Sequence, residues 1–145
     1  MARPKSNRYV FEPPMFREFK PVGVAARSLN TNKLTLDEYE AIRLADYQGL
    51  LHEEAASEMG ISRSTFSRLV VAARRKVSDS LINGKMLTIG GGKIHFRNNI
   101  IRCLNCRNIF KIKINSALMK CPVCGSANLQ NLAGGYGHGR CCANH

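Results

Sequence analysis

The stretch "EEAASEMGISRSTFSRLVVAARRKV", residues 53–77, decides the fold. It is typical of helix on both sides of Gly60, although a glycine inside a helix costs about 1 kcal/mol relative to alanine. Gly60 can instead take a left-handed conformation that ends one helix, and Ser62 can cap the next. The pattern therefore predicts a helix over residues 51–59, a tight turn, and a longer helix from Arg63 to about Asn83, which together form a helix-turn-helix.

Apolar residues lie where two crossing helices need them. The positions expected to face inward are Ala55, Met59, Ile61, Phe66 and Leu69. The longer helix repeats apolar residues at spacings of three and four, typical of one buried helical face, at Phe66, Leu69, Val70, Ala73, Val77 and Leu81. An earlier helix begins after Thr35, which can form a capping box with Glu38, and ends at Gly49.

The outward face of the longer helix is basic and polar. In a helix-turn-helix the first turns of the second helix enter the major groove, where arginine reads guanine and serine contacts bases or phosphates. We expect phosphate contacts farther along this helix and from a basic N-terminal arm. The predicted DNA-binding residues are Arg63, Ser64, Ser67, Arg68, Arg74, Arg75, Arg3 and Lys5.

The net charge favours a polyanionic partner. The chain has 22 Lys and Arg against 10 Asp and Glu, and no acidic residue follows Asp79. Such an excess attracts nucleic acid. No apolar run is long enough for a membrane span or a signal peptide, so a cytoplasmic protein without membrane partners is predicted.

With these features, the chain resembles a small prokaryotic family of predicted DNA-binding proteins, whose helix-turn-helix is similar to region four of primary sigma factors. The motifs that carry the resemblance are "ARPK", "FKPVG", "LTLDEYEAIRLADYQGL", "EEAASEMGISRSTFSRLVVAARRKV" and "LINGK", within residues 2–92. The resemblance implies a helix-turn-helix fold and transcriptional regulation. Leu51 and His52 depart from the pattern, because relatives tend to place a serine cap and a glutamine there.

Two Cys-x-x-Cys pairs predict a metal site. Cys103, Cys106, Cys121 and Cys124 can present four thiolates to one tetrahedral ion, and a strand is expected over residues 109–114. We expect Zn²⁺ in a zinc ribbon, which this stretch also resembles, with iron in a rubredoxin-like site as the rival. Basic residues could give the ribbon a phosphate-facing surface, although a structural or protein-docking ribbon is nearly as well supported: Arg102, Arg107, Lys111, Lys113 and Lys120.

The sequence thus predicts a mainly α fold: a helix-turn-helix domain with a small β zinc-ribbon module. The expected parts are a basic arm (1–33), the helix-turn-helix domain (34–92), the ribbon (93–132) and a flexible tail (133–145).

The predicted function is sequence-specific binding of double-stranded DNA by a transcription regulator that is not an enzyme. A homodimer and contact with RNA polymerase stay open. One alternative is a metal- or redox-responsive switch that uses His138, Cys141, Cys142 and His145; another is a docking module for the transcription machinery.

Overall fold

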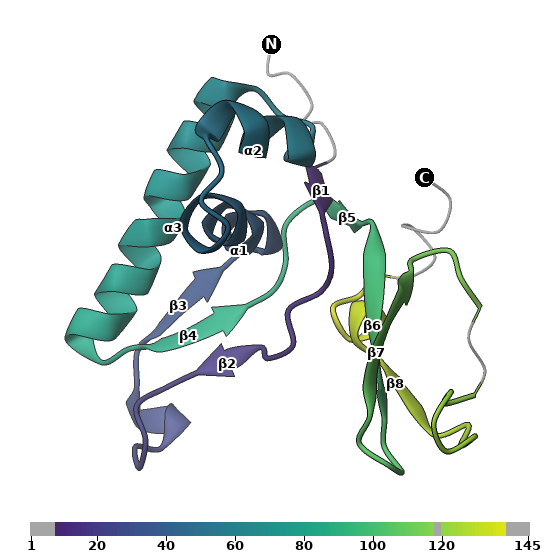
Figure 1. The fold of residues 1–145 in the computed structure, drawn as a ribbon. Coiled ribbons are helices and arrows are strands. Elements are labelled where there is room, and N and C mark those ends of the chain that lie inside the picture. Colours follow the sequence, from purple (N-terminus) through teal and green to yellow (C-terminus); the bar gives the residue numbers. More distant parts are fainter. Residues whose placement is uncertain (1–7, 118–119, 139–145) are drawn as a thin grey trace. The chain divides into compact units, whose positions relative to one another are not determined.

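The computed structural model describes residues 8–117 and 120–138 (Figure 1). Arg3, Lys5, Cys141, Cys142 and His145 lie outside the described residues. The chain divides into two compact units. Unit 1 contains the chain up to Tyr9 and residues 16–94, and unit 2 contains residues 10–15 and the chain from His95 onward.

The fold is mixed α/β, with about 37% of residues in helices and 23% in strands, so the expectation of a mainly α protein is wrong. The difference comes from short strands: one near residues 16–23 and extended runs within residues 85–101 were expected, but a strand at residues 31–34 was not. In unit 1 these are β2 (Glu18–Phe19), β3 (Thr31–Leu34) and β4 (Met86–Ile89). Strands of two to four residues show little period-two alternation, so they give a weak sequence signal.

These strands form one sheet in the order β2-β4-β3 (Figure 1). β4 pairs antiparallel with β2 and parallel with β3, with Leu34 opposite Ile89. A parallel pair needs a long crossover, and here the helical segment between β3 and β4 supplies it. The sequence of residues 85–101, two β-prone runs around a triple glycine, is compatible with a hairpin or with a strand followed by a linker. The two runs do not pair with each other, because β5 (Ile94–Phe96) pairs instead with β1 (Arg8–Val10).

The helices begin and end at the predicted signals. Before them, a short 3-10 turn, η1, spans Ala26–Ser28. Thr35 makes the expected capping box with Glu38 at the start of α1 (Leu36–Ile42). The helix expected to run on to Gly49 changes after Ile42 into a π-helical turn, η2 (Arg43–Tyr47).

Gly60 forms the turn between α2 (His52–Met59) and α3 (Arg63–Asn83). Its φ of +70° lies in the left-handed region that glycine adopts without steric cost. Ser62 then accepts a hydrogen bond from the Thr65 amide and caps α3. Leu51, the residue before α2, provides no side-chain cap, as expected from its apolar side chain.

The core of unit 1 lies where the three helices meet. All five residues expected to face inward belong to it: Ala55, Met59 and Phe66 are buried, and Ile61 and Leu69 pack against them partly buried.

The prediction fails at the end of α3, where Leu81 is 80% exposed. α3 extends beyond the helical core there and contacts the sheet through polar groups. The Asn32 amide donates to the Lys76 carbonyl and to the side chains of Asp79 and Ser80.

Unit 2 is built on a three-stranded antiparallel sheet in the order β7-β6-β8. Its strands are β6 (Asn98–Cys103), β7 (Ile109–Lys113) and β8 (Leu129–Asn131). β7 confirms the strand expected over residues 109–114. A short helix, α4 (Leu132–Gly135), follows, so the segment expected as a flexible tail begins inside a helix whose Leu132 and Ala133 are buried.

In the described part of the chain, no helix combines the length and apolar character that a bilayer crossing needs.

Candidate functional site

The first candidate site is the exposed face of α3. Residues three and four apart share one face of a helix, and this spacing groups Ser64, Ser67, Arg68, Val71 and Arg75. Ser67 is half-buried and the other four are exposed. Four residues of this face, together with Ala72, line a shallow hollow of about 380 Å³: Ser67, Arg68, Val71 and Arg75.

The predicted arginines do not all have the same surroundings. Arg63 in the first turn of α3 is exposed, as are Arg68 and Arg75. Arg74 instead forms a bidentate ion pair with Asp46 of η2, with nitrogen-to-oxygen distances of 2.7 and 3.0 Å. This hydrogen-bonded pair lowers the pKa of Asp46 and raises that of Arg74. The positive charge of Arg74 is therefore paired with an acidic side chain of the protein, and its phosphate contact stays a prediction.

The start of the face is held in place by α2. The His52 ring lies 5.3 Å from the Phe66 ring in an edge-to-face arrangement, and its Nδ1 is 2.9 Å from the Ser67 hydroxyl. His52 is thus a packed histidine that fixes Ser67. The exposed acidic residues of α2, Glu53, Glu54 and Glu58, would repel phosphates, so a polyanion would approach from the α3 side.

The second candidate site is the cysteine cluster of unit 2. The sulfur atoms of Cys103, Cys106, Cys121 and Cys124 all lie within 4.8 Å of one another. Two sulfur pairs, Cys103 with Cys124 and Cys106 with Cys121, are 3.6 Å apart. A tetrahedral ion with metal–sulfur bonds of about 2.3 Å would hold its thiolates about 3.8 Å apart. The four cysteines therefore fit a tetrahedral metal ion.

The two Cys-x-x-Cys loops have matching backbone hydrogen bonds. The Arg107 amide donates to the Cys103 carbonyl, and the Gly125 amide donates to the Cys121 carbonyl, both at 2.9 Å. Sulfur also accepts backbone hydrogen bonds in both loops: the Cys106 amide donates to Cys103 Sγ, and the Val123 amide donates to Cys121 Sγ. Such donors stabilise thiolates, the form that binds metal.

Cys124 shows the same effect most clearly. A hydrogen bond from the Ser126 backbone and a second from the Asn105 side chain lower the pKa of Cys124 to about 6. Asn105 Nδ2 lies 3.7 Å from the Cys124 sulfur. Sequence analysis missed Asn105 as a supporting residue; an amide inside a Cys-x-x-Cys pair was the available signal.

The cysteine segment, which we define as residues 103–128, has almost no core of its own. Among its described residues only Cys103 and Cys121 are buried. Apolar residues such as Leu104 and Val123 are exposed by 41% and 69%. A segment with so little buried apolar surface needs another source of stability, and a bound metal ion would supply it.

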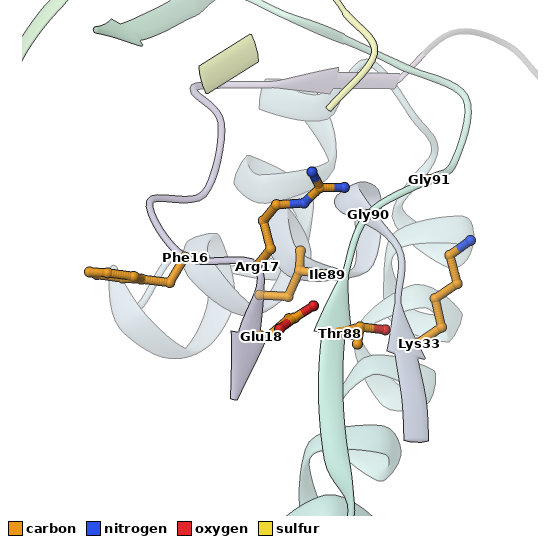
Figure 2. Close-up of a pocket in the computed structure, with 8 residues that line it drawn as sticks. All are labelled: Phe16, Arg17, Glu18, Lys33, Thr88, Ile89, Gly90 and Gly91. Carbon is orange, nitrogen blue, oxygen red and sulfur yellow. The ribbon is translucent and has the colours of Figure 1, made fainter. Parts of the chain in front are cut away.

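A further hollow, of about 580 Å³, lies over the open face of the sheet of unit 1 (Figure 2). Thr88 of β4 lies between Glu18 of β2 and Lys33 of β3, because both residues are its partners in the strand register. Arg17, Ile89, Gly90 and Gly91 also line the hollow, as does Phe16, whose ring points away from the other labelled side chains (Figure 2). The hollow holds charges of both signs, so it favours no single class of ligand.

Comparison with known proteins gives a family match. The profile of the family described as "Protein of unknown function DUF134" matches residues 1–97, which include α1–α3 and end before the first cysteine. A "UPF0251 protein" of Chloroherpeton thalassium is 44% identical over 97% of this chain and 95% of its own length. One of Methanococcus vannielii is 52% identical over 66% of this chain and 74% of its own length.

These relatives occur in bacteria and archaea, as expected for a prokaryotic family. Neither the family description nor the names of these relatives state a DNA-binding function. No solved structure matches the chain significantly.

Proposed function

This chain belongs to the DUF134 family, and we propose that it binds double-stranded DNA sequence-specifically through α3 and regulates transcription. One observation carries the proposal: the exposed face of α3 presents Arg68 and Arg75 around a slim surface of serine, alanine and valine. No acidic residue occurs in α3 before Asp79. An α-helix is about 10–12 Å across and the major groove about 12 Å wide, so such a face fits the groove.

The roles of the individual residues follow from their positions. Arg63 and Arg68 are exposed in the first turns of α3 and would donate hydrogen bonds to base edges, with Ser64 beside them. Arg75 would contact a phosphate farther along the helix. Ser67 would add little to base recognition, because His52 already binds its hydroxyl.

The four-cysteine cluster would hold Zn²⁺ as a structural ion. Four thiolates fill the tetrahedron and leave no open position for a substrate, which supports a binding protein over an enzyme. We propose zinc rather than iron because zinc is the usual ion of a closed four-cysteine structural site. The metal content of the purified protein, measured by mass spectrometry, tests this choice.

Binding-site selection with the purified chain, followed by affinity measurements on the selected duplex, tests the DNA proposal. Arg68→Ala should weaken specific binding by about 5- to 150-fold, which corresponds to the roughly 1–3 kcal/mol of one good arginine–base contact. Arg63→Ala should act in the same direction.

The matched control is Arg27→Ala, which removes an exposed arginine of unit 1 outside α3, in η1. It should change the affinities for selected and random duplexes by the same small factor. If Arg68→Ala and Arg27→Ala behaved alike, or if no duplex were enriched, the proposal would be wrong. A homodimer and contact with RNA polymerase stay predictions.

A further inference from the structure

Arg107 has an unusual backbone conformation for its residue type. Its φ of +66° makes it the one non-glycine residue with positive φ in the described part of the chain. Left-handed backbone is uncommon for residues with a side chain, and glycine adopts it without that cost. The second Cys-x-x-Cys loop shows the alternative, because Gly125 occupies the matching position with a φ of +75°.

The matching hydrogen bonds show that both loops need this conformation. Arg107 and Gly125 each follow the last cysteine of a pair and each donate an amide to the carbonyl of its first cysteine. A glycine would therefore serve the metal loop better at position 107. An arginine there needs an explanation in its side chain, since persistent backbone strain often marks a functional residue.

The charge of Arg107 is not balanced by an acidic residue of unit 2. The sequence has no acidic residue after Asp79, so Glu12 is the one acidic side chain of unit 2. Glu12 is bound by Lys111 at 3.0 Å. Arg107 itself is exposed. The first metal loop therefore presents an exposed arginine on a turn that is closed by a backbone hydrogen bond.

We propose that Arg107 is a second DNA contact, which binds a backbone phosphate of the duplex from the first metal loop. This inference rests on the proposed function of α3 and adds to it. A guanidinium binds phosphate with two parallel hydrogen bonds. A turn held by a metal ion and by backbone hydrogen bonds would keep the backbone of Arg107 in place, so little backbone freedom would be lost on binding.

The substitution Arg107→Gly separates this role from a structural one. It should keep one metal ion per chain and leave the thermal stability of the loop equal or higher, because it relieves the strained backbone. It should nevertheless lower affinity about 3- to 10-fold for selected and random duplexes alike. The slope of log affinity against log salt should become less steep by about 1, as expected for one lost phosphate contact.

Two further variants complete the test with the zinc-loaded full chain. Arg107→Lys should recover most of the affinity, because it restores the charge. Lys113→Ala removes an exposed charge from the far end of β7 and should change the salt slope by less than Arg107→Gly does.

The outcomes distinguish this inference from the proposal on which it rests. If Arg68→Ala weakens binding while Arg107→Gly leaves affinity and salt slope unchanged, the inference is wrong and the function of α3 stands. If Arg107→Gly lowers zinc affinity but zinc-saturated protein binds DNA normally, Arg107 serves the metal site and the inference is also wrong. If the wild-type chain binds no duplex, or prefers RNA of the same length, both proposals fail.

Discussion

The three-helix core of unit 1 closes around apolar side chains, with Phe66 and Met59 fully buried and Leu44 only 2% exposed. The cysteine segment of unit 2, residues 103–128, buries only Cys103 and Cys121 among its described residues. The first region is stabilised by the removal of apolar surface from water. The second brings four thiols within 4.8 Å of one another, and its stability would depend on a metal ion bound by them. The two regions should therefore fail under different treatments.

Removal of the metal should have the largest effect. A structural zinc ion contributes an apparent binding free energy of about 10–16 kcal/mol in zinc-finger peptides, and the cysteine segment has no core to replace it. A strong chelator should abolish the dispersed amide NMR signals of residues 103–128 while the signals of α1–α3 remain. If the chelator abolished the signals of both regions, or of neither, the two regions would not differ in their source of stability.

Truncation of the helical core should come next. Phe66→Ala should cost about 3–5 kcal/mol of unfolding free energy, because it leaves a cavity where a fully buried ring stood. Urea unfolding measures this cost, and zinc stoichiometry should not change.

Leu81→Ala is the matched control on the same helix, since Leu81 is 80% exposed. It should change stability by no more than about 0.5 kcal/mol. Equal costs for the two variants would mean that the core lies elsewhere.

Substitution of one turn glycine in each region, Gly60 and Gly125, should have smaller effects. Gly60→Ala should cost about 1–2 kcal/mol for left-handed backbone, and its Cβ would also meet the Tyr9 ring at 3.2 Å. Gly125→Ala would also place an alanine in left-handed backbone, but no heavy atom lies within 4 Å of the new Cβ. Gly60→Ala should lower the urea midpoint of the helices, and Gly125→Ala should lower zinc affinity. If Gly60→Ala lowered zinc affinity, or Gly125→Ala lowered the urea midpoint of the helices, the two regions would not be independent.

The smallest effect is expected at the Arg74–Asp46 pair. Asp46→Ala should change stability by no more than about 1 kcal/mol, since both partners are partly exposed. It removes a negative charge and releases Arg74 for phosphate, so DNA affinity should rise a few-fold, measured as a fluorescence-anisotropy Kd. A fall in affinity would mean that the pair orients α3 for binding.

The parts predictable from sequence were those with local and repeated signals. Gly60 and Ser62 marked the turn, the spacing of Phe66 and Leu69 marked the core, and the paired cysteines marked the metal site. Each of these signals acts over a few residues.

The misses depended on contacts between distant residues. Asp46 and Arg74 are 28 positions apart, so nothing local showed that their charges cancel. β3 pairs with β4 over a long separation and carries little alternation, which is why this strand was not expected and the β content of unit 1 was underestimated. Leu81 continued the apolar spacing of α3 past the point where neighbouring helices could cover it.

The central claim is that the exposed face of α3 contacts DNA, and NMR titration of isotope-labelled chain with its selected duplex tests it most directly. We expect the largest shifts in the amide signals of Arg63, Ser64, Arg68 and Arg75 and in the guanidinium signals of the three arginines, with little change at Leu81 and Ile82. If the α3 signals stayed in place while shifts appeared only elsewhere in the chain, the assignment of this helix as the DNA-reading element would be contradicted.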